Sequence, residues 1–203
     1  LAGAVAILTI TGCSDGIKVG QADESPKSLS DRDGKRIFLY GDSIRIGYEQ
    51  ALRELLMGDK VWSPGLMNGH SSREMAQFFD DSSRYYYIDL FVINAGIRDR
   101  RLNVSLPEYQ RNILKVIDLL LDETNLPDDA PKDKEIILLT STKDTTEMYN
   151  EWLRTATFPK NVRVLDLYTF ALHLDREDNL HFDEENSAIL AREIYREIRQ
   201  LSR

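Results

Sequence analysis

The chain has 203 residues, of which 42% are hydrophobic, and a formal net charge of −8 at pH 7. This length is enough for one substantial hydrophobic core and too short for two ordinary enzymatic domains. The negative charge argues against a nucleic-acid partner, because phosphate binding needs clustered positive charge. A single cysteine, Cys13, excludes an internal disulfide and leaves the predicted domain without a thiol for cysteine–histidine catalysis.

The first segment, residues 1–12 (LAGAVAILTITG), contains no charged side chain. It is shorter than the roughly 20 residues that span a bilayer, and it has the apolar character of a secretion signal. Residues 10–13 (ITGC) then resemble a bacterial lipobox, where cleavage leaves a lipidated cysteine as the new N-terminus. A lipid on Cys13 would hold a secreted protein at a membrane, in the periplasm or at the cell surface. The alternative is an N-terminal strand or helix that carries an ordinary buried cysteine.

A tether is predicted next. Residues 14–35 are rich in Ser, Asp, Gly and Lys and show no apolar periodicity. We therefore expect three parts: a lipoprotein-type signal segment at 1–12, a lipidated cysteine with a flexible tether at 13–35, and one catalytic domain at 36–203.

Within that domain, apolar runs of strand length alternate with segments of helical period. Strands are expected at 37–40, 61–62, 88–94, 135–140 and 162–167, and helices at 44–56, 72–79, 106–123, 147–155 and 186–201. The consecutive apolar residues 136–139 are typical of a parallel strand that is covered on both faces. The pattern predicts an α/β fold, a three-layer α/β/α sandwich around a mainly parallel five-stranded sheet. Functional loops should lie at the C-terminal ends of the strands.

The tripeptide Gly41-Asp42-Ser43 stands between the first predicted strand and the first predicted helix. Glycine permits a tight turn there, and a serine at the start of a helix has its backbone N–H aimed at incoming negative charge. Ser43 is therefore a candidate nucleophile. The same tripeptide also fits an ordinary helix cap.

A serine nucleophile needs a base within hydrogen-bond reach and a third group that orients the base. Asp178 and His181, in a predicted loop before the last helix, can supply that pair. Of the other two histidines, His173 fits a surface or packing position. His70 lies close to the expected oxyanion loop, where it either contacts the substrate or is simply solvated.

Taken together, four segments resemble the blocks of the SGNH, or GDSL-type, hydrolases, which are named for catalytic Ser, Gly, Asn and His residues. The segments are GDSIRIGY at 41–48, SPGLMNGHSS at 63–72, INAGIRD at 93–99 and DNLHF at 178–182. Their order and separations are similar to those of the family, over about residues 36–201. The resemblance implies the flavodoxin-like SGNH fold and a catalytic triad of Ser43, Asp178 and His181. It also implies oxyanion donors at the N–H groups of Ser43 and Gly69.

The third block departs from the family pattern. The usual Gly-x-Asn-Asp supplies an asparagine side chain to the oxyanion, and here Arg98 stands at that position. Residues 94–99 (NAGIRD) are closer to the Asn-x-Gly-x-His-Asp form of some bacterial branches. Asn94 would then fix the loop or join the oxyanion hole, while Arg98 replaces the missing donor, faces the substrate or is merely solvated. Losing one oxyanion donor costs about 3–4 kcal/mol of transition-state stabilisation.

Charge placement suggests an arginine rim, formed by Arg45, Arg98, Arg100 and Arg101, at the same end of the predicted sheet. Arginine suits bidentate carboxylate recognition, so the rim is expected to bind an anionic group of the substrate, such as a uronic acid. The alternative is that these arginines pair with Asp99 and neighbouring acidic side chains.

The resemblance implies a serine esterase that acts on a small-molecule or carbohydrate ester and needs no cofactor. No metal-ligand spacing and no phosphate-binding loop occurs in the sequence. A lipid-tethered protein without an obvious apolar lid fits removal of acetyl groups from carbohydrate. The alternatives are a lipase or lysophospholipase at the membrane, or a catalytically weak binding protein, which the arginine at position 98 suggests.

Overall fold

The computed structural model describes residues 34–64 and 70–201. One five-stranded sheet runs through the molecule in the order β2-β1-β3-β4-β5. The strands are β1 (Arg36–Tyr40), β2 (Lys60–Trp62), β3 (Leu90–Asn94), β4 (Glu135–Leu139) and β5 (Val162–Leu165). Each pair of neighbouring strands in this sheet is parallel. The predicted α/β fold with a parallel five-stranded sheet is confirmed.

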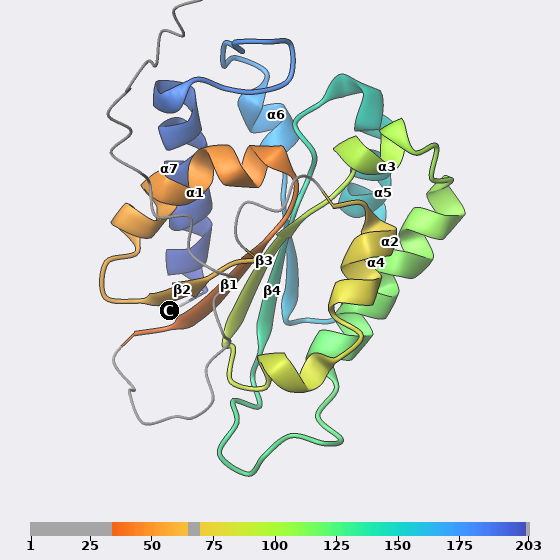
Figure 1. Cartoon of the computed structure of the whole chain (residues 1–203), viewed down its shortest axis with the longest axis vertical. Helices are drawn as coiled ribbons and strands as arrows, with labels where there is room; N and C mark the ends of the chain where they lie inside the picture. The colour runs from red at the N-terminus through yellow and green to blue at the C-terminus, as the bar shows by residue number, and fades with distance from the viewer. Residues whose placement is uncertain (1–33, 65–69, 202–203) are drawn as a thin grey trace, which may run out of the picture.

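Helices cover both faces of the sheet, which gives three layers (Figure 1). One face carries α1 (Ser43–Leu55), α6 (Leu167–Ala171) and α7 (Glu184–Gln200). The other carries α2 (Ser72–Phe78), α4 (Leu106–Leu121) and α5 (Glu147–Thr155). Shorter elements join them: η1 (Ser82–Tyr85), α3 (Ile97–Arg101) and η2 (Asp144–Thr146).

The core divides into two clusters because successive strand residues point to opposite faces of a sheet. In β1, Ile37 and Leu39 pack toward α1 and α7, whereas Phe38 and Tyr40 pack toward α2. The central strands β1 and β3 are buried along their whole length. Burial on both faces explains why these strands read as continuous apolar runs rather than as alternating ones.

Three predicted strands are shorter in the structure than in the prediction, and the one expected at 135–140 ends at Leu139. The strand expected at 88–94 begins at Leu90, because Asp89 instead accepts hydrogen bonds from the backbone and side chain of Arg36. The strand expected at 162–167 ends at Leu165, because the carboxylate of Asp166 caps α6 by accepting from the Thr169 N–H.

The loop expected after β3 is in fact the short helix α3, which begins after Gly96. Gly96 has a φ of 137°, a conformation that a side chain would strain, and it turns the chain from the strand into this helix. A helix of five residues is too short for apolar periodicity to reveal it.

The C-terminal ends of the parallel strands lie at one edge of the sheet, and the connection from α6 to α7 passes over that edge (Figure 1). The predicted lipidation site Cys13, the tether up to residue 33 and the predicted oxyanion residue Gly69 lie outside the described residues. Within 34–64 and 70–201, none of the helices combines the length and apolar character needed to cross a bilayer.

Candidate active site

Ser43, His181 and Asp178 meet at the C-terminal edge of the sheet. The Oγ of Ser43 lies 2.9 Å from Nε2 of His181, although the two residues are 138 positions apart in the sequence. On the other side of the ring, Nδ1 of His181 lies 2.7 Å from Oδ2 of Asp178. Ser43 is the first residue of α1, and the other two lie between α6 and α7. The three groups form a continuous hydrogen-bonded series, which is the arrangement that proton transfer from a hydroxyl requires.

The segment from Asp178 to His181 is a compact turn built around the Asp178 carboxylate. Its Oδ1 accepts from the backbone N–H of Leu180 at 3.1 Å and of His181 at 2.7 Å. Asn179 has a φ of 62°, in the left-handed region that asparagine tolerates better than most residues. The backbone hydrogen bond from His181 is the main cause that lowers the pKa of Asp178 to about 2, so this carboxylate is ionised at neutral pH. It therefore accepts from Nδ1–H and leaves Nε2 to face Ser43.

The turn that presents Ser43 is tied to the neighbouring strand β3. Oδ1 of Asp42 accepts from the Ile44 N–H at 3.0 Å, which caps α1, and from Nδ2 of Asn94 at 2.8 Å. Asn94 is the last residue of β3 and is buried. A Cβ on Gly41 would lie 1.8 Å from Oδ1 of Asn94, so a side chain at position 41 would displace the Asn94 amide from its present position. These contacts fix the position of Ser43 relative to the ends of β1 and β3.

The environment of Asp42 disfavours the ionised form of its carboxylate. Burial raises its pKa from 3.8 to about 6, against the lowering effect of the hydrogen bonds from Asn94 and Ile44. Its second oxygen, Oδ2, is buried and has no hydrogen-bond partner among the described residues. Ionised Asp42 is therefore a cost to the folded state, which the sequence did not indicate.

Replacing Asp42 with asparagine should change how stability depends on pH. Between pH 3.8 and about 6 the unfolded chain loses the Asp42 proton first, so wild-type stability falls as pH rises and then levels off. Asp42→Asn keeps the accepting oxygen and removes the charge. As the pH rises from 4 to 7, the free energy of unfolding of the variant should exceed that of the wild type by an increasing amount, up to roughly 3 kcal/mol. Urea unfolding at a series of pH values measures this difference. A difference between the two proteins that is flat with pH would contradict this.

Arg98 pairs with a neighbouring acidic side chain, as the alternative to a substrate role expected, but its partner is Glu74 and not Asp99. Nε of Arg98 donates to Oε2 of Glu74 at 3.2 Å, and the arginine side chain is 40% exposed. Asp99 is fully buried, and its carboxylate accepts from the N–H and the hydroxyl of Ser72 at 2.9 and 2.6 Å. Asp99 therefore anchors the start of α2 to α3.

The predicted arginine rim is wrong for Arg45. Its side chain is 0% exposed and pairs with Glu49 one turn further along α1, because the helix directs position 45 inward rather than to the rim. Arg100 and Arg101 are exposed on α3.

His70, predicted to contact substrate, lies just before α2. Its Nδ1 is hydrogen-bonded to the hydroxyl of Tyr40, the last residue of β1, and its side chain is partly buried. Burial is the main cause that lowers the pKa of His70, so this ring is a neutral hydrogen-bonding group at pH 7.

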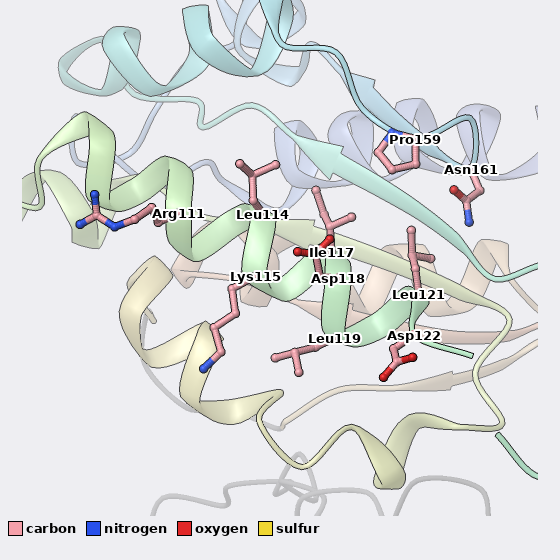
Figure 2. A pocket seen from close by; sticks show the side chains of 10 residues that line it. All are labelled: Arg111, Leu114, Lys115, Ile117, Asp118, Leu119, Leu121, Asp122, Pro159 and Asn161. Atoms are coloured by element: carbon pink, nitrogen blue, oxygen red, sulfur yellow. The ribbon is translucent and has the colours of Figure 1, made fainter. Parts of the chain in front are cut away.

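A separate groove of about 920 Å³ runs along α4, opposite the chain segment that leads into β5 (Figure 2). It is lined by Arg111, Leu114, Lys115, Ile117, Asp118, Leu119, Leu121, Asp122, Pro159 and Asn161. No member of the Ser43–His181–Asp178 series lines it, so it is not the site of their chemistry. In the part of the chain that the structure describes, no group of three His, Cys, Asp or Glu side chains could hold a metal ion.

Two basic residues that the sequence did not single out contact the turn that carries His181. Lys143 Nζ donates to the carbonyl oxygen of Asn179, and Arg176 Nη1 donates to that of Leu180 at 2.9 Å. Backbone carbonyls leave no trace in a sequence pattern, so spacing alone could not have revealed either contact.

Comparison with known proteins places the fold. No family model matches the chain. No curated protein sequence matches it either.

Solved structures do resemble it, at low sequence identity. A member of the lipolytic G-D-S-L family from Veillonella parvula has a TM-score of 0.62 and 15% identity, over 80% of this chain and 97% of that one. A carbohydrate acetylesterase from Sinorhizobium meliloti has a TM-score of 0.61 and 14% identity, over 83% and 100%. The catalytic domain of a peptidoglycan O-acetyltransferase from Streptococcus pneumoniae has a TM-score of 0.60 and 17% identity, over 83% and 94%. The fold of this chain is thus similar to that of these three proteins, one of which is named as a member of the lipolytic G-D-S-L family.

Proposed function

We propose that the protein is a serine ester hydrolase of the G-D-S-L type. The observation that carries this proposal is the unbroken series from the Ser43 hydroxyl through the His181 ring to the Asp178 carboxylate, at 2.9 and 2.7 Å. The fold supports it, since structures of the same fold include proteins named as esterases.

The mechanism follows from the direction of these hydrogen bonds. The Ser43 hydroxyl donates to Nε2 of His181, which takes the proton as Oγ attacks the ester carbonyl. Asp178 accepts from Nδ1–H and stabilises the ring while it is charged. His181 then gives the proton to the departing alcohol oxygen and leaves an acyl group on Ser43. Water then attacks the acyl-enzyme as it loses a proton to His181, and His181 gives this proton to Oγ of Ser43 as the bond to the acyl group breaks and the acid departs.

The oxyanion would be received by the backbone N–H of Ser43, which is the first residue of α1. We propose the N–H of Gly69 as a second donor. Asn94 and Arg98 are less direct candidates, because Asn94 already donates to Asp42 and Arg98 to Glu74. In this proposal Asn94 acts mainly by holding the nucleophile turn, and Arg98 with Arg100 faces the substrate.

For the substrate we propose acetyl esters on carbohydrate. Proteins of this fold include a carbohydrate acetylesterase and an acetyl-xylooligosaccharide esterase. His70 is hydrogen-bonded to Tyr40, the last residue of β1, and Arg98 pairs with Glu74. Polar and charged side chains of this kind suit hydroxyl-rich ligands better than acyl chains.

A panel of esters tests the substrate proposal. We expect kcat/KM on p-nitrophenyl acetate and acetylated xylo-oligosaccharides to exceed that on p-nitrophenyl decanoate by about tenfold or more, since a methylene misplaced in a polar site costs binding energy. Preference for the decanoate would contradict the carbohydrate substrate and favour a lipase. Activity on none of these esters would favour a binding protein.

We also propose that Cys13 carries the lipid that anchors the protein outside the cytoplasm. Cys13→Ser, expressed with the complete signal in a bacterial host, should move from the membrane fraction to the soluble fraction, because the acyl chains provide the membrane affinity. Equal membrane association of both forms would contradict the anchor.

A further inference from the structure

The turn that carries Asp178 and His181 lies at the surface. The side chains of His181 and Asp178 are 40% and 57% exposed, whereas Ser43 is fixed from below by a buried network. Phe182, directly after His181, is 7% exposed and anchors this end of the turn in the core. A proton transfer tolerates little displacement, so contacts that hold the exposed part of the turn matter for the reaction.

Arg176 makes contacts that can do this. Its Nη1 donates to the carbonyl oxygen of Leu180 at 2.9 Å, directly before His181. Its Nη2 donates to the carbonyl oxygen of Thr142, in the segment that follows β4. Its guanidinium carbon lies 4.3 Å from the ring centre of Phe182, directly after His181. One side chain thus contacts both sequence neighbours of His181.

The segment around Thr142, to which Arg176 Nη2 donates, is itself buried and held by hydrogen bonds. Thr142 is 2% exposed, and the preceding residue Ser141 is held by Asn150, whose Oδ1 accepts from the Ser141 N–H and whose Nδ2 donates to the Ser141 carbonyl, each at 2.8 Å. Lys143, the next residue, donates to the carbonyl of Asn179. The turn is therefore tied to a buried part of the sheet edge rather than to another exposed loop.

We propose that Arg176 is a positioning residue, which bridges the carbonyls of Thr142 and Leu180 and so keeps His181 within hydrogen-bond reach of Ser43. This inference rests on the proposed function. It assigns no contact between Arg176 and the substrate. Two donors of the planar guanidinium are directed at backbone carbonyls, which is a geometry that lysine cannot reproduce with a single ammonium group.

Arg176→Gln and Arg176→Lys test the proposal, with Arg199→Gln as a matched control. Arg199 also lies over an aromatic ring, Tyr195 at 5.0 Å, and bonds a polar partner, Asp59 at 2.7 Å. It is at the far end of α7, about 25 Å along the helix from the turn. Both arginine sites should contribute to stability, and only Arg176 should affect the proton transfer.

The expected result is a fall in kcat and in the rate of fluorophosphonate labelling of about tenfold to a hundredfold for both Arg176 variants, with KM changed less than threefold. Arg199→Gln should keep wild-type rates. Guanidinium chloride at millimolar concentration should restore part of the kcat of Arg176→Ala, which a merely structural defect would not show. If Arg176→Gln folds poorly, restoration of the kcat of Arg176→Ala by guanidinium chloride tests the positioning role instead.

Three results would overturn the inference. A folded Arg176→Gln with wild-type kcat would show that the bridge from Arg176 to Thr142 and Leu180 is not needed to position His181, and the proposed function would stand. A rise in KM with unchanged kcat would assign Arg176 to substrate binding. Absence of labelling in the wild type would remove the proposed function and this inference together.

Discussion

Ser43→Ala should lower kcat on p-nitrophenyl acetate by about 10⁴-fold or more while leaving the protein folded. The expectation follows from the position of Ser43, whose hydroxyl is the only group that the structure brings to Nε2 of His181 among the described residues. Ser43 is the first residue of α1, and the side chain of Asp42 caps this helix. Removal of the Ser43 hydroxyl oxygen should therefore leave the fold intact. The measurement is steady-state hydrolysis together with thermal unfolding.

Ser83→Ala serves as the control, because Ser83 is exposed and its hydroxyl donates to Asp81 in a surface turn. It should retain wild-type kcat. Ser43→Ala with activity near that of Ser83→Ala would contradict the catalytic assignment, provided that both proteins unfold at similar temperatures.

Gly41→Ala should destabilise the protein by about 3 kcal/mol and should also lower its activity strongly. The new Cβ would lie 1.8 Å from Oδ1 and 2.6 Å from Cγ of Asn94, so the buried amide of Asn94 must move. That movement breaks the contact between Asn94 and Asp42 and displaces the start of α1. Urea unfolding and ester hydrolysis measure the two effects.

Gly47→Ala is the matched control on the same helix. Its Cβ would meet a single atom, Oγ of Ser187 at 3.2 Å, and alanine is favoured over glycine within a helix. We expect a change within about 1 kcal/mol and unaltered kcat. If Gly41→Ala behaved like Gly47→Ala, the close approach of Gly41 to the Asn94 side chain would not be needed for the geometry of the site.

The sequence predicted the layers of the fold well because hydrophobic burial dominates them. Strands covered on both faces, such as residues 136–139, are continuous apolar runs, and long helices show apolar residues at a regular spacing. The order of the strands within the sheet, by contrast, has no corresponding pattern in the sequence. It depends on contacts between residues far apart, for example Phe38 beside Phe91 in neighbouring strands.

The candidate site was predictable where side-chain chemistry is encoded in short motifs. Ser43, Asp178 and His181 were selected by residue type and by position beside a strand or helix. Arg45 was misplaced because its charge suggested exposure, whereas the helix turns it inward to Glu49. Arg176 was missed because it recognises backbone carbonyls, which every residue carries.

The most direct test is to treat the folded protein with a fluorophosphonate and locate the adduct by peptide mass spectrometry. We expect one phosphonylated residue, Ser43, in the wild type, and at least about a hundredfold slower labelling in His181→Asn, since the serine then lacks its base. An active enzyme labelled at another serine, or equal labelling of both proteins, would contradict this expectation.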